Sequence, residues 1–200
     1  MLSPHNVASQ LVDRKIDVCF AHADQNGDGV MDQSDVIALG ARIIVYIGES
    51  FTSPKAQTVL EAFENFAKYM ISVMDTNMDN QVSPLEWRDG MKRAFANGSD
   101  YDDHLRPIGV ALWNLADKDG DGRVNVNEFA AFQRAMGTSP GNSRIAFEKM
   151  DRNNDGSLSV EEMLQAHREF YTSPDPDAPG NWLYGDVWAH NFWDGTKAKL

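Results

Sequence analysis

Four twelve-residue segments with oxygen-bearing side chains at the same alternate positions constrain this chain more than any other feature. The clearest is DKDGDGRVNVNE, residues 117–128, in which Asp, Asp, Asp, Asn and Glu occupy positions 1, 3, 5, 9 and 12. Alternate residues of a chain that wraps around a sphere point inward, so this spacing offers several oxygens to one hard cation. Position 6 must turn sharply with a positive φ, which Gly122 does without steric cost.

This spacing is that of the EF-hand calcium loop, and it recurs at residues 24–35, 75–86 and 151–162. We name these segments loops 1 to 4 in chain order. A single acidic, glycine-containing surface turn that binds nothing is the alternative, and fourfold repetition in one register favours binding. Because position 7 would contribute only its backbone carbonyl, we expect the identity of Arg123 to be free.

The predicted Ca²⁺ ligands lie at positions 1, 3, 5, 7 and 12, and position 12 closes the site with two oxygens. They are Asp24, Asn26, Asp28, Val30 and Asp35 in loop 1; Asp75, Asn77, Asp79, Gln81 and Glu86 in loop 2; Asp117, Asp119, Asp121, Arg123 and Glu128 in loop 3; and Asp151, Asn153, Asp155, Ser157 and Glu162 in loop 4.

Two loops depart from the pattern. Asn80 replaces the glycine of loop 2, and asparagine is the next-best residue for a left-handed turn. Asp35 replaces the closing glutamate of loop 1 and is one methylene shorter, so we expect it to reach the ion through one oxygen. That change weakens the binding of Ca²⁺ and suits the smaller Mg²⁺. We therefore predict up to four Ca²⁺ ions, with Mg²⁺ competing at loop 1.

The flanking sequences predict helices. Apolar residues recur three and four apart before each loop, at Ile16, Cys19, Phe20, Ala23; Ala67, Met70, Ile71, Met74; Gly109, Leu112, Trp113, Ala116; and Ser143, Ala146, Phe147, Met150, with Gly109 and Ser143 as exceptions. Position 8 of every loop is apolar, so we expect short antiparallel pairs of Met31 with Val82 and of Val124 with Leu158. Ser53-Pro54, Ser83-Pro84 and Ser139-Pro140 read as helix starts, and Gly48 and Gly137 as helix stops.

The predicted fold is all-α, with two pairs of EF-hands packed into one globule. The N-terminal pair spans residues 1–97 with loops 1 and 2, the C-terminal pair spans 104–171 with loops 3 and 4, and a proline- and aromatic-rich tail spans 172–200. The polar segment Asn97–Asp100 is the expected linker between the pairs. The uneven spacing of the loops predicts long helices and an extended connection within residues 36–74.

Composition narrows the function classes. A formal charge of −12 disfavours nucleic acid and anionic membrane as partners, and the loop carboxylates account for it. Four bound Ca²⁺ ions would bring that charge to −4. The single cysteine, Cys19, excludes an internal disulfide framework. No catalytic motif is present, so we expect a non-enzymatic, monomeric protein.

Location is predicted from two further features. No leader or long apolar run appears, so we expect a cytoplasmic protein; Ala198-Lys199-Leu200 resembles a peroxisomal address.

Over residues 10–185 the chain resembles the sarcoplasmic calcium-binding proteins and their calerythrin-like bacterial relatives. Four EF-hands, a long first interloop segment and the tail YTSPDPDAPGNWLYG carry the resemblance. It implies two EF-hand pairs packed face to face in a calcium buffer or transporter. The chain departs from calerythrin-like members in keeping the ligands of loop 2, and it continues beyond the family tail.

The tail bears on the choice between a buffer and a sensor. Prolines after Tyr171 end the last helix, and a run of aromatics follows from Trp182 to Trp193. We expect Trp182–Tyr184 to fold back and plug the groove between the helices. A sensor needs that groove open for a target helix, so a plugged groove favours a Ca²⁺ buffer. A sensor that regulates a partner protein is the alternative, although nothing in the sequence indicates a particular target.

His167 supports a second alternative. It follows loop 4 on the face that carries Met163 and Phe170, where a core histidine with a hydrogen-bond partner is expected. The calcium-triggered photoproteins and luciferin-binding proteins also place a histidine followed by aromatics in this helix. That resemblance implies a small-ligand carrier with Tyr171, Trp182 and Tyr184 near His167. The N-terminal and central aromatic positions do not match it.

Overall fold

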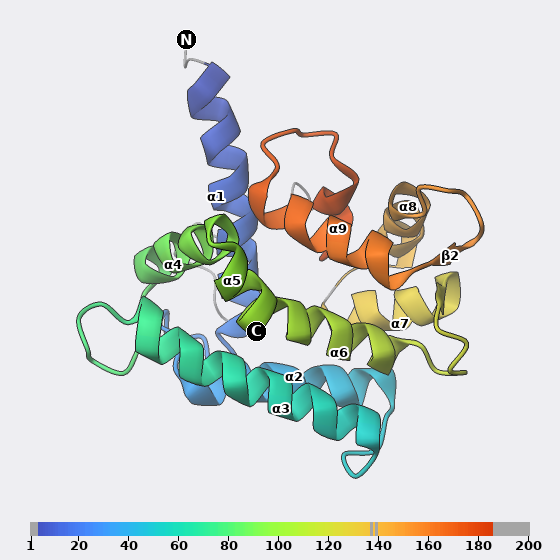
Figure 1. Cartoon of the computed structure of the whole chain (residues 1–200), viewed down its shortest axis with the longest axis horizontal. Helices are drawn as coiled ribbons and strands as arrows, with labels where there is room; N and C mark the ends of the chain where they lie inside the picture. Colours follow the sequence, from blue (N-terminus) through green and yellow to red (C-terminus); the bar gives the residue numbers. More distant parts are fainter. Residues whose placement is uncertain (1–3, 137, 139, 186–200) are drawn as a thin grey trace.

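The computed structural model describes residues 4–136, 138 and 140–185, and nearly all of its regular structure is helical. Figure 1 shows helices joined by the four loops, with α1 projecting from the body. The elements are α1 Pro4–Ala23, α2 Gln33–Ile47, α3 Pro54–Tyr69, η1 Met70–Met74, α4 Pro84–Ala96, α5 Gly98–Asp100, η2 Tyr101–Leu105, α6 Arg106–Ala116, β1 Val124–Asn125, α7 Val126–Ala135, α8 Pro140–Met150, β2 Ser157–Leu158, α9 Val160–Thr172 and η3 Pro179–Trp182.

Several helix ends follow the local sequence as predicted. The Ser53 side chain accepts a hydrogen bond from the Ala56 N–H group and caps α3 ahead of Pro54. Ser83 caps α4 in the same way. Gly48 ends α2 with a φ of 76°, a left-handed conformation that favours glycine. The predicted signals at Gly137 and Ser139 lie outside the described residues.

One prediction about connections was wrong. Residues 36–74 hold no extended connection, because α2 and α3 with η1 fill this region and only residues 48–53 join them. The expected linker Asn97–Asp100 interrupts the helices at Asn97 and continues into the short helix α5, whose start the Asn97 side chain caps by accepting from the Ser99 N–H group at 3.3 Å. A turn-rich composition therefore marked a helix start here.

In the described part of the chain, one π-helical turn follows α3 and another precedes α6. In η1 the Asp75 N–H group bonds back to the Met70 carbonyl, directly before loop 2. In η2 the Arg106 N–H group bonds to the Tyr101 carbonyl. Pro107 follows and has no N–H group, so it cannot continue the ordinary helical ladder at this point.

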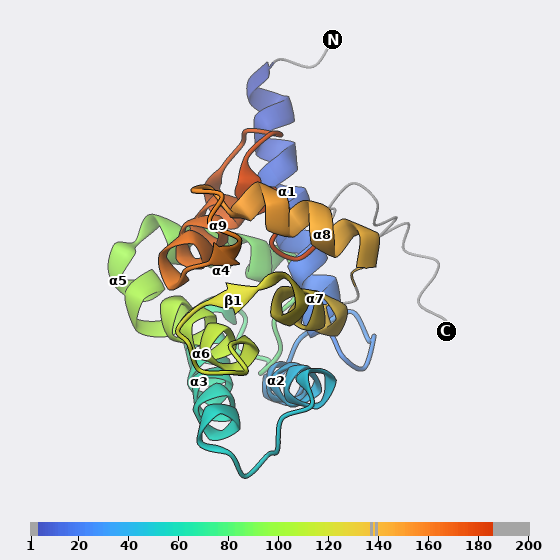
Figure 2. The ribbon, with the colours of Figure 1, turned by 90° about the vertical axis from the view of Figure 1, so that its right-hand side faces the viewer.

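The two predicted halves share one core. Helices α2 and α3 lie side by side, α2 packs on α7, and α3 packs on α6, while α1 and α4 pack on α9 (Figures 1 and 2). The buried apolar side chains form one cluster that extends from Leu11 to Leu183. This arrangement confirms the predicted all-α globule. None of the described helices is long and apolar enough to cross a membrane.

The first part of the tail folds back onto the helices, as predicted. The short helix η3 packs on α8 and α9, and Leu183 is 2% exposed. The Tyr184 ring lies edge-on to Phe170 with centroids 4.9 Å apart. The aromatic residues that follow, Trp188, Phe192 and Trp193 among them, lie outside the described part of the chain, as do Ala198–Leu200.

Candidate calcium sites

The loops lie in two pairs joined at position 8. Met31 and Val82 form an antiparallel bridge with hydrogen bonds of 2.9 and 2.8 Å, and β1 pairs with β2 so that Val124 faces Leu158. All four side chains are fully buried. Both predicted pairings are confirmed.

The position-1 aspartate organises each loop. In loop 3 Asp117 Oδ1 accepts from the Gly120 N–H group at 2.7 Å, and its Oδ2 accepts from Gly122 at 3.0 Å. Asp24, Asp75 and Asp151 likewise accept from the N–H groups at position 6 and at position 4 or 5 of their own loops. Each carboxylate therefore curls its loop around its own oxygens.

The side chains at positions 3 and 5 repeat a second pattern. The position-3 oxygen accepts from the N–H group at position 5, and the position-5 oxygen accepts from the N–H group at position 7, at 2.8–3.1 Å throughout. These bonds orient alternate side chains into the loop, which is the arrangement that the sequence spacing predicts. The residues at position 3 are Asn26, Asn77, Asp119 and Asn153, and those at position 5 are Asp28, Asp79, Asp121 and Asp155.

The position-12 carboxylate closes every loop. In loop 3 Glu128 Oε1 accepts from the Lys118 N–H group at 2.8 Å, and Oε2 accepts from Asn125 at 2.9 Å. The same two bonds, from positions 2 and 9, are made by Asp35, Glu86 and Glu162. Position 9 also caps the following helix in all four loops, through Asp32, Ser83, Asn125 and Ser159.

Position 4 carries a constraint that sequence reasoning missed. It is left-handed in all four loops, with φ of 72° at Gly27, 62° at Met78, 76° at Gly120 and 56° at Asn154. Loop 2 uses non-glycine residues at both left-handed positions, since Asn80 has a φ of 65° as predicted. Such a residue costs about 1–2 kcal/mol relative to glycine, so loop 2 is the most strained of the four. The glycine at position 4 of loops 1 and 3 was the available signal.

Loop 3 provides a test of whether the residues fit a cation. Oxygens of Asp117, Asp119 and Glu128 all lie within 4.8 Å of one another. Two oxygens on opposite sides of one Ca²⁺ ion would be about 4.6–5.2 Å apart, because each Ca–O distance is about 2.3–2.6 Å. The three carboxylates therefore fit one Ca²⁺ ion.

Two closing carboxylates differ in their electrostatics. Burial by itself raises the pKa of Glu86, but hydrogen bonds from Ser83 and Thr76 outweigh it and lower that pKa to about 2. Asp35 is 3% exposed, and burial raises its pKa above the ordinary value although the Asp32 N–H group opposes the shift. Loop 2 therefore holds its closing carboxylate ionised more firmly than loop 1 does.

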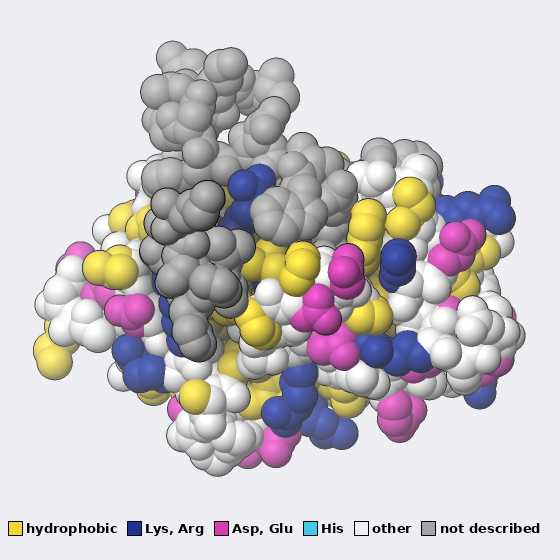
Figure 3. All heavy atoms as spheres, turned by 90° about the horizontal axis from the view of Figure 1, so that it is seen from above, with side chains coloured by type: hydrophobic (Ala, Val, Ile, Leu, Met, Phe, Trp, Pro, Cys, Tyr) yellow, Lys and Arg dark blue, Asp and Glu magenta, His cyan; other side chains and the backbone are white. Residues whose placement is uncertain are grey.

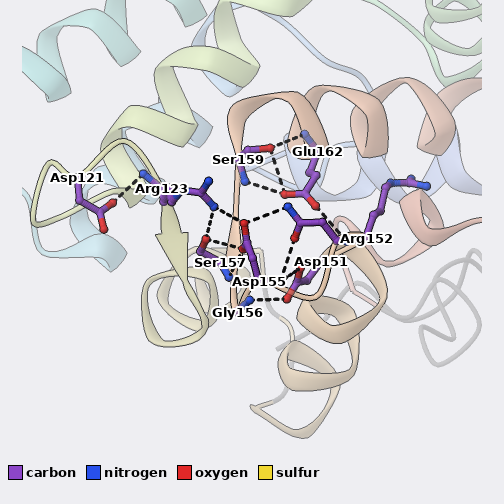
Figure 4. A network of polar contacts seen from close by, with 10 residues as sticks. Asp121, Arg123, Asp151, Arg152, Asp155, Gly156, Ser157, Ser159 and Glu162 are labelled. Atoms are coloured by element: carbon purple, nitrogen blue, oxygen red, sulfur yellow. Dashed lines mark hydrogen bonds and ion pairs between the residues drawn. The ribbon is translucent and has the colours of Figure 1, made fainter.

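The identity of Arg123 is not free, contrary to expectation. Figure 4 shows its side chain crossing from loop 3 to loop 4, where Nη1 lies 2.5 Å from Asp155 Oδ2 and 2.6 Å from Ser157 Oγ. Pairing of β1 with β2 brings the two loops within reach of this side chain. Loop 3 also receives a contact from the N-terminal half, because Lys55 Nζ donates to the Asp117 carbonyl.

A buried lysine ties the tail to the first and last helices, and sequence reasoning missed it. Lys15 is fully buried, and its Nζ donates to the carbonyls of Glu169 and Ser173 and to Asn181 Oδ1 at 3.1, 2.7 and 2.9 Å. Burial lowers the pKa of Lys15 to about 8, opposed by the charge of Glu169. Gln133 of α7 donates to the carbonyls of Trp182 and Leu183 at 3.0 and 2.6 Å. A polar residue within an apolar stripe was the only available signal.

His167 lies in the core among aromatic rings. Its Nδ1 is 3.5 Å from the Tyr101 hydroxyl, and its ring lies edge-on to Phe95 and Tyr171. Burial, followed by the positive charge of Arg168, lowers the pKa of His167 to about 4. The adjoining central cavity has a volume of about 80 Å³ and is lined mostly by apolar side chains, with Trp87, His167 and Tyr184 on its wall.

Comparison with known proteins agrees with this geometry. The EF-hand family profile matches residues 67–92, 114–133 and 144–166, which contain loops 2, 3 and 4. Calerythrin of Saccharopolyspora erythraea is 28% identical over 154 residues, covering 76% of this chain and 87% of calerythrin. Clytin of Clytia gregaria, a photoprotein, is 29% identical over 180 residues, covering 84% of each chain.

A solved structure has the same fold. It is a calcium-binding protein of Streptomyces coelicolor, studied for prokaryotic calcium-mediated regulation, with a TM-score of 0.69 and 26% identity over 82% of this chain and 99% of its own.

The loops, their pairing and these matches define an EF-hand calcium-binding protein. Within that class, the chain is calerythrin-like.

Proposed function

We propose that this protein is a cytoplasmic Ca²⁺ buffer that stays closed when its loops fill. The ligands we assign are the residues at positions 1, 3, 5, 7 and 12 of the four loops, with Mg²⁺ competing at loop 1. The proposal for loop 1 rests on the shorter, buried Asp35, and that for loops 2 to 4 rests on their closing glutamates. Regulation of a partner protein is the alternative, and the Streptomyces relative supports it.

The packed tail is the observation that carries the buffer proposal. Leu183 is buried in the shared core, and Gln133 holds it from α7, the helix that leaves loop 3. Burying one leucine side chain stabilises a fold by about 1.5–3 kcal/mol, so opening the groove costs at least that much. A sensor would have to meet this cost with calcium binding before a target helix could enter.

The anchor of the tail is also polar and buried. All three hydrogens of the Lys15 ammonium group have acceptors, and one acceptor, Asn181, uses its own amide group to bind the carbonyls of Asp175 and Pro176 at 2.9 Å. Pulling η3 away from α9 would leave the buried Lys15 charge without its Asn181 acceptor. Loss of a hydrogen bond to a buried charge is more costly than loss of a neutral one.

One face of the described part of the molecule carries charges of both signs. On the face drawn in Figure 3, Lys and Arg side chains are interspersed with Asp and Glu side chains around the apolar ones. Specific recognition of a strongly charged partner would favour a patch of one sign. On this face, the distribution favours ion storage over recruitment of a charged target.

Dye binding tests the proposal. The intact chain should bind little of a hydrophobic dye with or without excess calcium, whereas deletion of residues 182–200 should raise dye binding sharply in the calcium form. It should also lower Tm by several degrees. Deletion of residues 186–200 alone is the matched control, because it keeps Leu183 and its contacts. Strong calcium-dependent dye binding by the intact chain, unchanged by the longer deletion, would contradict the buffer proposal and favour a sensor.

A small-ligand carrier is the second candidate, favoured by the cavity beside His167 and by the resemblance to clytin. Sites for drug-sized ligands usually have volumes of about 300–1,000 Å³. The cavity of about 80 Å³ is too small for such a ligand unless the tail moves, since Tyr184 forms part of its wall. Fluorescence titration with a hydrophobic imidazopyrazinone would decide, and saturable one-to-one binding by the intact chain would support the carrier.

A further inference from the structure

We infer that Arg123 is a tethered cation that Ca²⁺ must displace in loop 4, so that loop 3 fills before loop 4. This inference rests on the proposed role of both loops as calcium sites. It assigns a determinant of affinity to a position that the EF-hand pattern leaves variable.

The hydrogen bonds of Asp155 carry the argument. Its Oδ1 accepts from the N–H group and the hydroxyl of Ser157 at 3.0 and 2.8 Å, and its Oδ2 accepts from Arg123 and from the Asn153 amide at 2.5 and 3.0 Å. A carboxylate has about four lone-pair positions, so these four bonds use all of them. A Ca²⁺ ion can bind Asp155 only after one of these bonds breaks.

The corresponding ligand of loop 3 is not blocked in this way. Asp121 Oδ1 accepts from the Arg123 N–H group at 2.8 Å, and within the described part of the chain its Oδ2 makes no hydrogen bond. Loop 3 also has aspartates at positions 1, 3 and 5, whereas loop 4 has an asparagine at position 3. Loop 3 therefore presents more negative charge and fewer competing donors to an incoming cation.

Arg123 also connects the two sites through its backbone. It occupies position 7 of loop 3, where its carbonyl is the predicted ligand. Its guanidinium contacts Asp155 of loop 4. An ion in loop 3 would therefore fix the backbone of Arg123, whose side chain competes with Ca²⁺ for Asp155 in loop 4. The N-terminal pair has no such charge at this position, because loops 1 and 2 carry Val30 and Gln81.

Arg123→Gln is the test, since loop 2 already carries glutamine at position 7. Amide NMR of the full chain during titration with CaCl₂ reports each site separately, because Gly122 and Gly156 each donate to the position-1 aspartate of their own loop. In the native chain the Gly122 signal should reach its midpoint at lower calcium than that of Gly156. In Arg123→Gln the Gly156 midpoint should fall about two- to fivefold, as expected for loss of an exposed ion pair.

Arg144→Gln is the matched control, because it removes the same charge from an exposed pair with Glu148 on α8. It should leave the order of filling unchanged. Added salt should reduce the difference in the Gly156 calcium midpoint between the native chain and Arg123→Gln, since salt screens exposed ion pairs. A Gly156 midpoint that moves no more in Arg123→Gln than in Arg144→Gln would overturn the inference. Absence of any calcium response at Gly122 would instead overturn the proposed calcium site itself.

Discussion

At the scale of single residues, the same side-chain types do different work according to burial. Ser83 at position 9 of loop 2 was predicted as a helix start, and the structure uses the position-9 side chain of all four loops as a helix cap. Lys15 and His167 look alike in sequence, because each is a basic residue beside an apolar one of a predicted helix, Ile16 and Ala166 respectively. Lys15 holds three acceptors in the interior, whereas His167 lies among aromatic rings and is kept neutral.

The depressed pKa of His167 predicts a pH dependence. Its folded pKa is about 4 and its unfolded pKa is about 6.5, so the unfolded chain binds the proton first as pH falls. This contribution is complete above pH 6.5 and is lost between pH 6.5 and 4, by up to roughly 3 kcal/mol. His167→Phe should therefore remove up to about 1.4 kcal/mol per pH unit from the slope of unfolding free energy in this window. Urea unfolding of chelator-treated protein measures it, and equal slopes would contradict the assignment.

At the scale of elements, the contact between η3 and α9 decides whether the tail remains packed on the helices. Gly180 has no side chain at the point where a Cβ atom would overlap the Ala166 carbonyl and approach Glu169 Cβ to 2.5 Å. Its N–H group donates to Glu169 Oε2 at 3.0 Å, and the same carboxylate oxygen pairs with Arg152 of loop 4 at 2.6 Å. The tail is thus connected through one glutamate to a calcium loop.

Gly180→Ala should lift the tail from α9. We expect a loss of about 1–3 kcal/mol in unfolding free energy, the usual range for an overpacked contact, together with increased dye binding. Gly141→Ala is the control, because Gly141 lies in the first turn of α8 with nothing near its position, so this substitution should not lower stability. Equal effects of the two substitutions on stability, measured by chemical unfolding, would show that the contact is unimportant.

At the scale of the whole molecule, ion binding and charge are coupled. Four Ca²⁺ ions would reduce the formal charge from −12 to −4, which relieves repulsion among the loops. Contacts between the halves, such as Lys55 with the Asp117 carbonyl, place one half next to an ion loop of the other. Filling of the four loops should therefore stabilise the fold as one unit.

Calorimetric titration should give four Ca²⁺ ions per chain, with loop 1 the weakest. Glu128→Gln and Glu162→Gln should cause the largest losses of binding energy, Glu86→Gln a smaller one because loop 2 is strained, and Asp35→Asn the smallest. Millimolar Mg²⁺ should reduce Ca²⁺ binding only at loop 1. Equal losses in all four variants would contradict this ranking.

The amino-acid sequence by itself determined the four loops, their register and the helices around them. Those features depend on local spacing: carboxylates on alternate residues, a turn residue at position 6, and apolar residues three and four apart. The pairings of Met31 with Val82 and of Val124 with Leu158 also followed, because a buried position 8 has few partners. Even the left-handed conformation of Asn80 could be predicted from its position in the loop.

Only the tertiary structure decided what lies across from each element. The pairing of Arg123 with Asp155, the three acceptors of Lys15 and the fit of Gly180 against α9 join residues distant in sequence. Such contacts depend on the relative positions of the elements to within about an ångström. The periodicity of the sequence does not encode those positions. The helical segment at Gly98–Asp100 has the same origin, since a turn composition permits a helix start that packing then selects.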